Sequence, residues 1–317
     1  MCSFAEVAVN NNYTCPLINA SGELYIKEGR HPVVEKMLDA NTFISNDPYL
    51  NNLESRISII TGPNMAGKST YMRQTALITL MAQMGCFVPA QYAEIGVVDA
   101  IFTRVGASDD LASGQSTFMV EMMESSTILH NLSERSLVLL DEIGRGTSTF
   151  DGMSIAWAIV EYIHQHRERA KTLFATHYHE LNELEEIYPR VKNWHIAVKE
   201  VENNVIFLRK LCQGGVAHSF GIHVARMAGM PQAVVDSAQR TLNMLEKKEE
   251  GQTGKGLVSK KKKSSAADNL QLSFFQLEDP LLCDLRDSIK AMDINSMSPL
   301  DAFDAIRKLK EKLGLKR

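Results

Sequence analysis

Residues 62–70 read Gly62-Pro63-Asn64-Met65-Ala66-Gly67-Lys68-Ser69-Thr70 and contain the pattern G-x-x-x-x-G-K-[ST]. The β-branched run at 57–60 precedes this segment, and apolar residues at helical spacing follow it from Ser69 to Met84. In a loop between a strand and a helix, glycines let backbone N–H groups point at phosphate oxygens, and the helix N-terminus adds its positive end. The sequence therefore predicts a phosphate-binding loop, in which Lys68 reaches the β- and γ-phosphates of a nucleotide and the Ser69 hydroxyl binds Mg²⁺.

Further buried strands are predicted downstream of this loop. Apolar runs at 137–140 and 172–176 each end at polar residues, and helical spacing between them predicts a helix over 152–166. Uninterrupted apolar strands that alternate with helices are typical of a mainly parallel sheet covered on both faces. We therefore expect an α/β fold, namely a P-loop NTPase with a central, mainly parallel sheet.

Composition and turn signals divide the chain into five segments. A strand is predicted at 205–211, and helices at 219–228 and 232–247 flank the turn Gly229-Met230-Pro231. A polar stretch with the basic run Lys260–Lys263 predicts a solvated, disordered linker rather than a nucleic-acid site. The amphipathic tail after it is too short to bury a core alone, so we expect it to pair with a copy of itself. The segments are 1–55 (connector and short strands), 56–213 (core), 214–247 (helix-turn-helix), 248–269 (linker) and 270–317 (oligomerisation tail).

Two neighbouring carboxylates, Asp141 and Glu142, directly follow the apolar run at 137–140. A phosphate-binding loop needs a second metal contact, and a carboxylate at the end of a neighbouring strand supplies it in P-loop proteins. Adjacent side chains at a strand end point in different directions. We therefore expect Asp141 to bind the metal and Glu142 to face the γ-phosphate, where it orients or deprotonates the attacking water.

His177 follows the predicted strand at 172–176, at the carboxyl edge of the sheet where ligands bind in open α/β folds. We expect it to hydrogen-bond the γ-phosphate and so to respond to its presence. A metal pair with His179 is the alternative, but no Cys or carboxylate set in the sequence completes a zinc site around the two histidines.

The composition excludes some classes of protein. With 34 Lys plus Arg against 38 Asp plus Glu, the net charge is −4, and 44% of the residues are hydrophobic, which is enough for a full core. Global disorder is therefore excluded. The mild acidity argues against a chain that binds nucleic acid through a broad basic surface.

The five cysteines are widely spaced and form no C-x-x-C pair, which favours a reducing compartment. No basic flank precedes an apolar run at the N-terminus, so no signal peptide is predicted. Residues 74–93 carry no charge, but they contain Gln, Gly and Pro and follow the phosphate loop, so a buried helix that runs into a strand is predicted instead of a membrane span. We expect a soluble, cytoplasmic protein.

Longer motifs surround these sites. They are Thr61–Met65, Phe102–Asp110, Ser113–Met122, and Ile143–Thr149 followed by Asp151-Gly152. With these motifs, the chain closely resembles the ATPase domain of the MutS DNA mismatch-repair family, from near Ser3 to about Leu245 and more loosely through the tail. Members of that family are much longer, so the resemblance implies that this chain is the motor part and that the DNA-reading domains lie outside it.

The resemblance implies an ABC-type, Mg²⁺-dependent ATPase that works as a dimer. In it, Ser116, with Gly114 beside it in the signature, would reach across to the γ-phosphate held by the partner, and the loop 144–149 would lie along the dimer interface. Phe43 matches the aromatic residue that stacks on adenine. Ala66 departs from the pattern, because many relatives have Gly there; a methyl group should be tolerated at this position.

Partners are implied in the same way. The family's helix-turn-helix packs against the partner's ATPase core, and the small tail joins dimers into tetramers. Mismatched DNA would bind through the domains outside this chain, and a MutL-type repair protein is an expected partner; a membrane is not. The segment Phe4-Ala5-Glu6 imitates the family's Phe-x-Glu mismatch wedge, but it lies in the connector and is interpreted as a coincidence.

Other functions stay open as alternatives. A MutS relative used in recombination or other DNA maintenance is the nearest. A transporter-type ABC ATPase is less favoured, because Ser113–Thr117 is a poor match to its LSGGQ-like signature. Too few residues separate Lys68 from Ser116 for the long coiled coil of a chromosome-maintenance ATPase. A non-catalytic adaptor would not need Lys68, Asp141 and Glu142 together.

Overall fold

The computed structural model describes residues 2–39, 42–106, 116–201, 204–215 and 220–253. Its contacts divide the chain into two units, Met1–Glu246 and Lys247–Arg317. The second unit is described only where helix α8 (Gln232–Thr253) runs into it. The predicted tail at 270–317 and all of the predicted linker beyond residue 253 lie outside the described residues.

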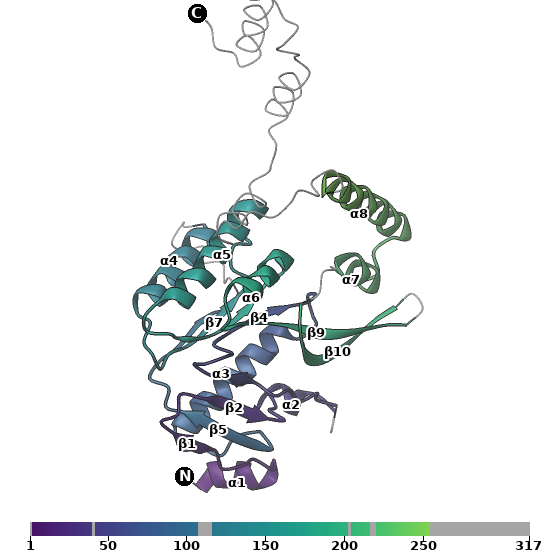
Figure 1. Cartoon of the computed structure of the whole chain (residues 1–317). Helices are drawn as coiled ribbons and strands as arrows, with labels where there is room; N and C mark the ends of the chain where they lie inside the picture. Colours follow the sequence, from purple (N-terminus) through teal and green to yellow (C-terminus); the bar gives the residue numbers. More distant parts are fainter. Residues whose placement is uncertain (1, 40–41, 107–115, 202–203, 216–219, 254–317) are drawn as a thin grey trace, which may run out of the picture. The chain divides into compact units, whose positions relative to one another are not determined.

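A six-stranded sheet forms the centre of the first unit (Figure 1). Its strand order is β10-β9-β4-β8-β7-β6, and all neighbours pair in parallel except β10, which is antiparallel to β9. Every residue of β4, β7 and β8 is buried, which explains why their sequences are mostly apolar and do not alternate with polar residues. The prediction of a mainly parallel sheet is therefore confirmed. The strands are β4 (Ile57–Thr61), β6 (Ile101–Arg104), β7 (Leu137–Asp141), β8 (Lys171–Ala175), β9 (Val191–Val201) and β10 (Asn204–Gln213).

A second, four-stranded sheet has the order β1-β5-β2-β3. The short strands predicted for the first 55 residues belong to it, but β5 joins them from beyond the phosphate loop. Helix α1 was not predicted; among its residues whose burial is described, Ala8 alone is buried. The elements are α1 (Cys2–Asn10), β1 (Leu17–Asn19), β2 (Leu24–Lys27), α2 (Val34–Met37), β3 (Tyr49–Leu50) and β5 (Tyr92–Gly96).

Helix α3 (Lys68–Gln83) lies between the two sheets, and α4 (Thr117–His130) and α5 (Thr149–Gln165) cover the opposite face of the larger sheet (Figure 1). One buried cluster joins α3 to both sheets through side chains such as Met72, Ile26 and Leu173. The helices therefore cover both faces of the parallel sheet, as the sequence pattern predicts. The carboxyl ends of β4, β7 and β8 meet at the edge where the phosphate loop begins.

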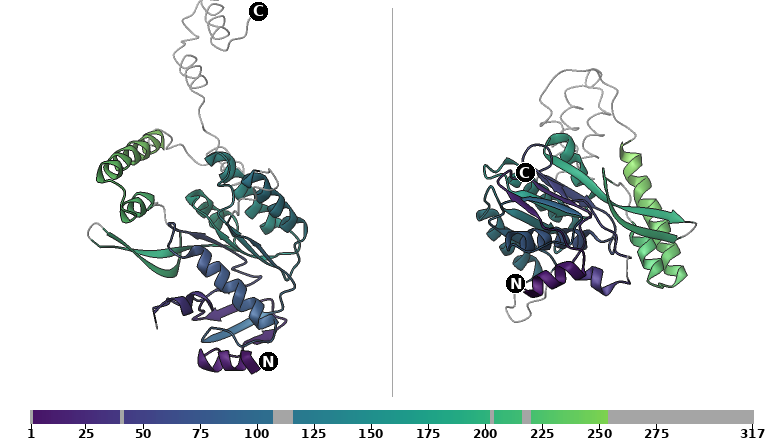
Figure 2. Two further views of the ribbon diagram at one scale, coloured as in Figure 1. Left: turned by 180° about the vertical axis from the view of Figure 1, so that it is seen from behind. Right: turned by 90° about the horizontal axis from the view of Figure 1, so that it is seen from below.

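Several boundaries differ from the sequence-based predictions. Helix α5 begins three residues early, at Thr149, because the Ser148 side chain accepts a hydrogen bond from the backbone N–H of Asp151. Tyr162 of this helix is 46% exposed, whereas its neighbour Ile163 is buried. Strand β9 was not predicted; it pairs along most of β10, and the hairpin extends beyond the rest of the sheet (Figure 2).

The C-terminal part of the described chain contains a short 3₁₀ turn (His179–Glu183), α6 (Leu184–Ile187), α7 (Gly221–Met227) and α8. The two helices predicted around Gly229 are present, and Gly229 takes the left-handed conformation with φ of 80°. Helix α8 continues to Thr253, so residues 248–253 of the predicted linker are helical.

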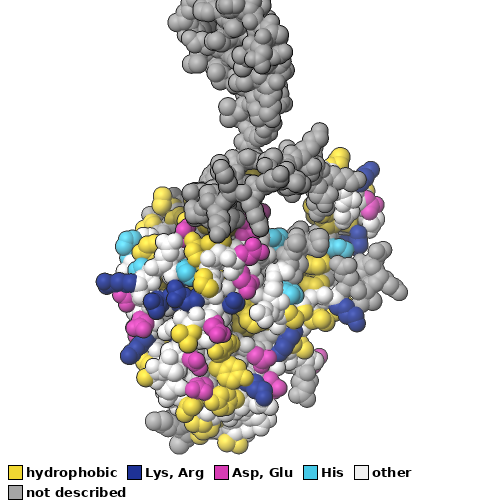
Figure 3. Space-filling model, in the orientation of Figure 1, with side chains coloured by type: hydrophobic (Ala, Val, Ile, Leu, Met, Phe, Trp, Pro, Cys, Tyr) yellow, Lys and Arg dark blue, Asp and Glu magenta, His cyan; other side chains and the backbone are white. Residues whose placement is uncertain are grey.

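Charged side chains of both signs lie on the surface, as the small net charge of −4 leads one to expect. On the face shown in Figure 3, acidic and basic side chains are interspersed. No helix within the described ranges is long and apolar enough to cross a membrane. The uncharged residues 74–93 form the later part of α3 and the beginning of β5, as predicted.

Candidate functional site

The loop from Gly62 to Gly67 connects β4 to α3 and takes an unusual backbone path. Gly62, Met65 and Gly67 have φ angles of 143°, 64° and 107°. A Cβ on Gly67 would meet no atom within 4 Å, so the glycine is needed there for its backbone conformation rather than for space. Ala66 is fully buried and has no positive φ, and its methyl group is therefore accommodated, as expected.

Lys68 is the first residue of α3 and folds back into the curve of the loop. Its side chain is only 4% exposed, and Nζ donates hydrogen bonds to the carbonyl oxygens of Gly62 (2.7 Å) and Pro63 (3.1 Å). Burial lowers the pKa of this ammonium to about 8, although the carboxylates of Glu142 and Asp141 oppose the effect. The loop therefore holds a partly desolvated cation, whose ion pair with Glu142 Oε1 is long, at 3.8 Å.

Asp141 ends β7 and lies beside the first turn of α3, where Ser69 and Thr70 are half-buried. Its residue is 9% exposed, and Oδ1 has no hydrogen-bond partner among the described residues. Burial raises the pKa of this carboxyl, and the Ser69 hydroxyl opposes the rise only in part. A buried carboxylate oxygen without a partner, next to a hydroxyl, fits the oxygen ligands that Mg²⁺ takes in nucleotide sites. Asp141 and Ser69 would hold the ion.

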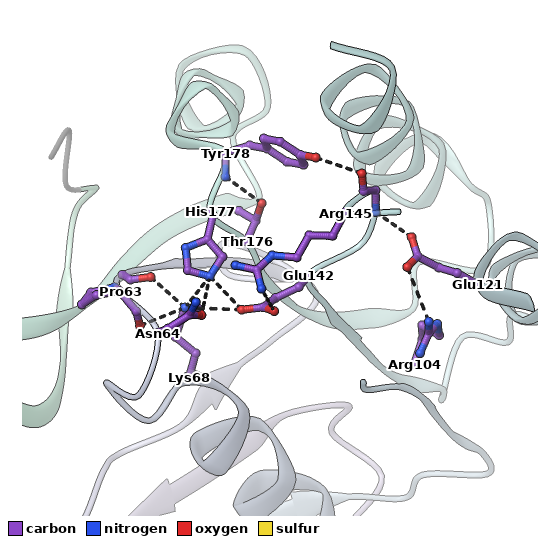
Figure 4. Close-up of polar contacts among 12 residues, drawn as sticks. Pro63, Asn64, Lys68, Arg104, Glu121, Glu142, Arg145, Thr176, His177 and Tyr178 are labelled. Carbon is purple, nitrogen blue, oxygen red and sulfur yellow. Dashed lines mark hydrogen bonds and ion pairs between the residues drawn. The ribbon is translucent and has the colours of Figure 1, made fainter. Parts of the chain in front are cut away.

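Glu142 has a φ of 58°, which turns its side chain away from that of Asp141. Its Oε1 lies 2.7 Å from His177 Nε2, and its Oε2 lies 2.6 Å from Arg145 Nη1 (Figure 4). Burial alone would raise the pKa of Glu142, but the His177 hydrogen bond and the Arg145 and Lys68 charges outweigh it and lower the pKa. The group is therefore a carboxylate at neutral pH.

His177 joins the loop to the carboxylate. It follows β8, and its Nε2 lies 2.9 Å from Asn64 Oδ1, 2.7 Å from Glu142 Oε1 and 3.3 Å from Lys68 Nζ (Figure 4). Four sequence-predicted residues, from the phosphate loop, the start of α3 and the ends of two strands, thus meet in one place. In the described part of the chain, no group of three or more His, Cys, Asp or Glu side chains is arranged to hold a metal ion.

Ser116 is the N-cap of α4, and its Oγ accepts a hydrogen bond of 3.1 Å from the Met119 N–H. Its side chain is exposed. None of the hydrogen bonds or ion pairs described for this chain joins Ser116 to the phosphate loop. Gly114, the other predicted signature residue, lies outside the described residues.

Phe43 is half-buried in the segment between α2 and β3. The neighbouring Asn46 ties this segment to β10, since its side chain bonds the Arg209 carbonyl at 3.0 Å and the Leu211 N–H at 2.7 Å. Arg209 itself has a φ of 55°, at an irregularity in the pairing of β10 with β9. The structure thus fixes the course of the chain next to Phe43.

A cavity of about 230 Å³ opens beside the phosphate loop. Helix α7 of the same chain forms one wall of it. The lining residues are Gly62, Pro63, Asn64, His177, His179, Phe220, Gly221 and Val224.

Sequence reasoning missed four residues that surround Glu142. Arg145 pairs with its carboxylate, and Glu121, Arg104 and Tyr178 hold the loop that carries Arg145 (Figure 4). Arg104, Glu121 and Arg145 lie inside the motifs 102–110, 113–122 and 143–149, whereas Tyr178 lies in none of them. The contacts made by Arg104, Glu121 and Tyr178 join residues far apart in the sequence, and no local pattern indicates them.

Comparisons with known proteins agree with these observations. The family described as MutS domain V matches residues 58–246. The DNA mismatch repair protein MutS of Flavobacterium johnsoniae is 56% identical over 99% of this chain, and those of Parabacteroides distasonis and Bacteroides fragilis are 59% and 57% identical over 97% and 98%. The chain spans 36% of the length of each of these relatives. Because the domain match covers more than half of its residues, the chain belongs to the MutS domain V family.

Proposed function

We propose that this chain is the ATP-binding and ATP-hydrolysing motor domain of a MutS-type DNA mismatch repair protein. The meeting of Lys68, Glu142 and His177 beside the phosphate loop is the observation that carries the proposal. It combines a buried cation for the phosphates with a carboxylate for the attacking water, which is the arrangement that phosphoryl transfer to water requires. The relatives' names support mismatch repair over the other uses of such a motor.

Each residue has a distinct part in the proposed reaction. Lys68 would exchange the carbonyl oxygens of Gly62 and Pro63 for phosphate oxygens, and the loop N–H groups would bind the remaining ones. Bound Mg²⁺, held by Ser69 and Asp141, would neutralise charge on the β- and γ-phosphates.

Glu142 is already ionised, so it can accept a proton from water once a nucleotide draws His177 toward the γ-phosphate. In the structure, His177 contacts one oxygen of the Glu142 carboxylate and Arg145 contacts the other.

The ABC-type features belong to the same proposal. Ser116 of one subunit would close over the γ-phosphate of the other, because its exposed position at the start of α4 leaves the helix N-terminus open to an anion. Phe43 would stack on adenine. Closure of a homodimer would change the grip of DNA-holding domains outside this chain, as a population shift between dimer states. The tail would allow tetramers, and a MutL-type protein would bind the assembled clamp.

The substitution Glu142→Gln tests the proposal. The amide keeps the shape of the side chain but accepts no proton, so ATP binding is expected to stay within about threefold of wild type while turnover falls by about 10² or more. Equilibrium nucleotide binding and phosphate release measure the two quantities separately. Glu168→Gln, in an exposed pair with Arg167, is the matched control and should change neither. Undiminished turnover in Glu142→Gln would remove Glu142 from the role of base.

A further inference from the structure

The backbone of Gly144, two residues after Glu142, is held from both sides. Its N–H donates a hydrogen bond of 2.6 Å to Glu121 Oε1, and its carbonyl oxygen accepts one of 3.0 Å from the Tyr178 hydroxyl. Glu121 comes from α4, whereas Tyr178 follows His177 after β8 (Figure 4). We refer to these two hydrogen bonds as the Gly144 clamp.

The backbone at the clamp has little freedom to rearrange. Gly144 has a φ of 91°, and a Cβ there would lie 2.5 Å from the carbonyl oxygen of Gly152 in the first turn of α5. The loop is therefore pressed against α5 as well as bonded to α4. Glu142, with its own positive φ of 58°, lies at the start of this constrained segment.

Glu121 is an unusual residue to find at this position, because it is only 7% exposed. A buried carboxylate is costly unless charged or hydrogen-bonding partners compensate for the lost water. Arg104 compensates part of the charge, with Nη2 at 3.4 Å from Glu121 Oε2, and Arg104 Nε also lies 3.0 Å from Glu124 Oε2. The remaining oxygen of Glu121 receives the Gly144 N–H, so the buried charge is directed at that amide.

The clamp connects three parts of the proposed site. Helix α4 begins at the Ser116 cap and carries Glu121 in its second turn. The loop after β7 carries Glu142 and Arg145, and the segment after β8 carries His177 next to Tyr178. A displacement of α4 would reach Glu142 through the backbone that joins Gly144 to Glu142.

We propose that Glu121 and Tyr178 are positioning residues, which hold the Gly144 backbone and thereby fix the direction of the Glu142 carboxylate relative to α4. This inference rests on the proposed ATPase function, but it assigns a role to residues that do not touch the nucleotide. It also gives the N-terminus of α4 a direct mechanical connection to the proposed base.

The test uses the full 317-residue chain and its single variants. Glu121→Ala leaves the Gly144 N–H without its acceptor; kcat is expected to fall by about 10-fold to 10²-fold, while the ATP dissociation constant changes by less than about twofold. In Glu121→Gln the amide oxygen can still accept the hydrogen bond, so most of the lost kcat should return. Tyr178→Phe, which removes the other bond, should lower kcat by a smaller factor.

Glu124→Ala is the matched control, since Glu124 is on the same helix and pairs with the same arginine but does not contact Gly144. It should keep kcat within about twofold of wild type. An equal loss of kcat in Glu124→Ala and Glu121→Ala would mean general loosening of α4 and would overturn the inference. So would a wild-type kcat in Glu121→Ala or a failure of Glu121→Gln to recover activity.

Failure of the proposed ATPase function and failure of the positioning role give different results. If the wild-type chain binds ATP but does not turn it over, the proposed function fails and the positioning role with it. If wild type turns over ATP and the clamp variants do so equally well, only the positioning role fails. Thermal unfolding is recorded for each variant; should Glu121→Ala not fold, Glu121→Gln and Tyr178→Phe decide the question through their kcat values.

Discussion

Asp141 and Glu142 are chain neighbours whose surroundings differ in ways that suit different chemistry. Asp141 keeps the strand direction of β7 and is buried beside Ser69, where burial raises the pKa of its carboxyl. Glu142 turns through a positive φ toward His177 and Arg145, where cationic and hydrogen-bonding neighbours lower its pKa. One residue is thus placed to coordinate a cation and the other to accept a proton.

A first prediction concerns the metal. Asp141→Asn keeps the size of the side chain but removes the charge that attracts Mg²⁺, so half-maximal turnover should require at least about tenfold more Mg²⁺. ATP binding measured with excess EDTA should change little, because the metal is then absent from both proteins.

A magnesium titration of turnover provides the measurement. Asp99→Asn is the control, since Asp99 accepts hydrogen bonds from Ser133 near the start of β7, at the opposite end of that strand from Asp141. A wild-type magnesium dependence in Asp141→Asn would contradict the assignment.

Helices α4 and α5 show how element ends are stabilised around the site. Both begin at a serine cap, Ser116 and Ser148, whose oxygen accepts a backbone N–H of the first turn. At the other end of α5, the buried Arg56 guanidinium donates to the carbonyl oxygens of Ile163 and His164. A cation at a helix C-terminus is favourable because the exposed carbonyls carry partial negative charge.

A second prediction separates the two possible roles of Ser116. Ser116→Ala should lower the free energy of unfolding by about 1 kcal/mol and abolish most ATP turnover. Ser116→Asp should restore the cap and the stability, because aspartate caps helices well, yet turnover should stay low because its charge repels the γ-phosphate.

Ser148→Ala is the control for the cap alone, with a similar loss of stability and little effect on turnover. Chemical denaturation and phosphate release are the two measurements. Full turnover in Ser116→Asp would show that Ser116 acts only as a cap.

A third prediction follows from His164 near the end of α5. Burial, reinforced by the charges of Arg56 and Arg190, lowers the pKa of His164 to about 4. Between pH 6.5 and 4 the unfolded chain therefore binds a proton that the folded chain does not, so stability falls as the pH falls through this window. This group alone should remove about 2 kcal/mol of unfolding free energy between pH 7 and pH 5.

Urea unfolding at the two pH values measures the effect. His164→Phe retains a ring to stack on Tyr188, whose centroid lies 4.5 Å away, and should show a correspondingly smaller loss on acidification. Tyr188→Phe keeps the imidazole and should retain the wild-type loss. Identical pH dependence in wild type and His164→Phe would refute the prediction.

At the scale of the whole molecule, two sheets enclose α3 and leave the phosphate loop at the edge of the larger one. The chain carries the loop, the metal residues and the base, but Ser116 makes its hydrogen bond within its own helix. In the proposed dimer, a second copy would supply its own Ser116 to complete the active site.

A fourth prediction tests this sharing. Lys68→Met removes nucleotide binding in its own loop but keeps Ser116, whereas Ser116→Asp keeps its loop. In an equal mixture, half of the dimers are mixed and each has one intact composite site, so about a quarter of the wild-type turnover should appear. Each variant alone should be nearly inactive.

Mixing Lys68→Met with Glu142→Gln is the control, because both lesions affect the subunit that holds the nucleotide and no composite site is restored. Turnover in mixtures is read against the dimer content measured by light scattering. No recovery in a mixture that forms dimers would argue against sharing between subunits.

The central strands, the phosphate loop and the paired carboxylates could be predicted because their signals are local. Apolar runs, helical spacing and the glycine pattern act over a few neighbouring residues, so β4, β7, β8 and α3 appear nearly where the sequence places them. The second sheet was not predicted as such, since β1 and β5 pair across more than seventy residues.

Long-range contacts also explain which features of the candidate site could not be predicted from the sequence. The residue types at Lys68, Asp141 and Glu142 follow from motifs, but the direction of Glu142 depends on His177, Arg145 and the Gly144 clamp. In the clamp, Gly144 bonds to Glu121, 23 positions away, and to Tyr178, 34 positions away. A local sequence pattern does not indicate such contacts. The chemistry of the candidate site is therefore encoded locally, whereas its geometry arises only when the packing of α4, β7 and β8 brings distant side chains within hydrogen-bond reach.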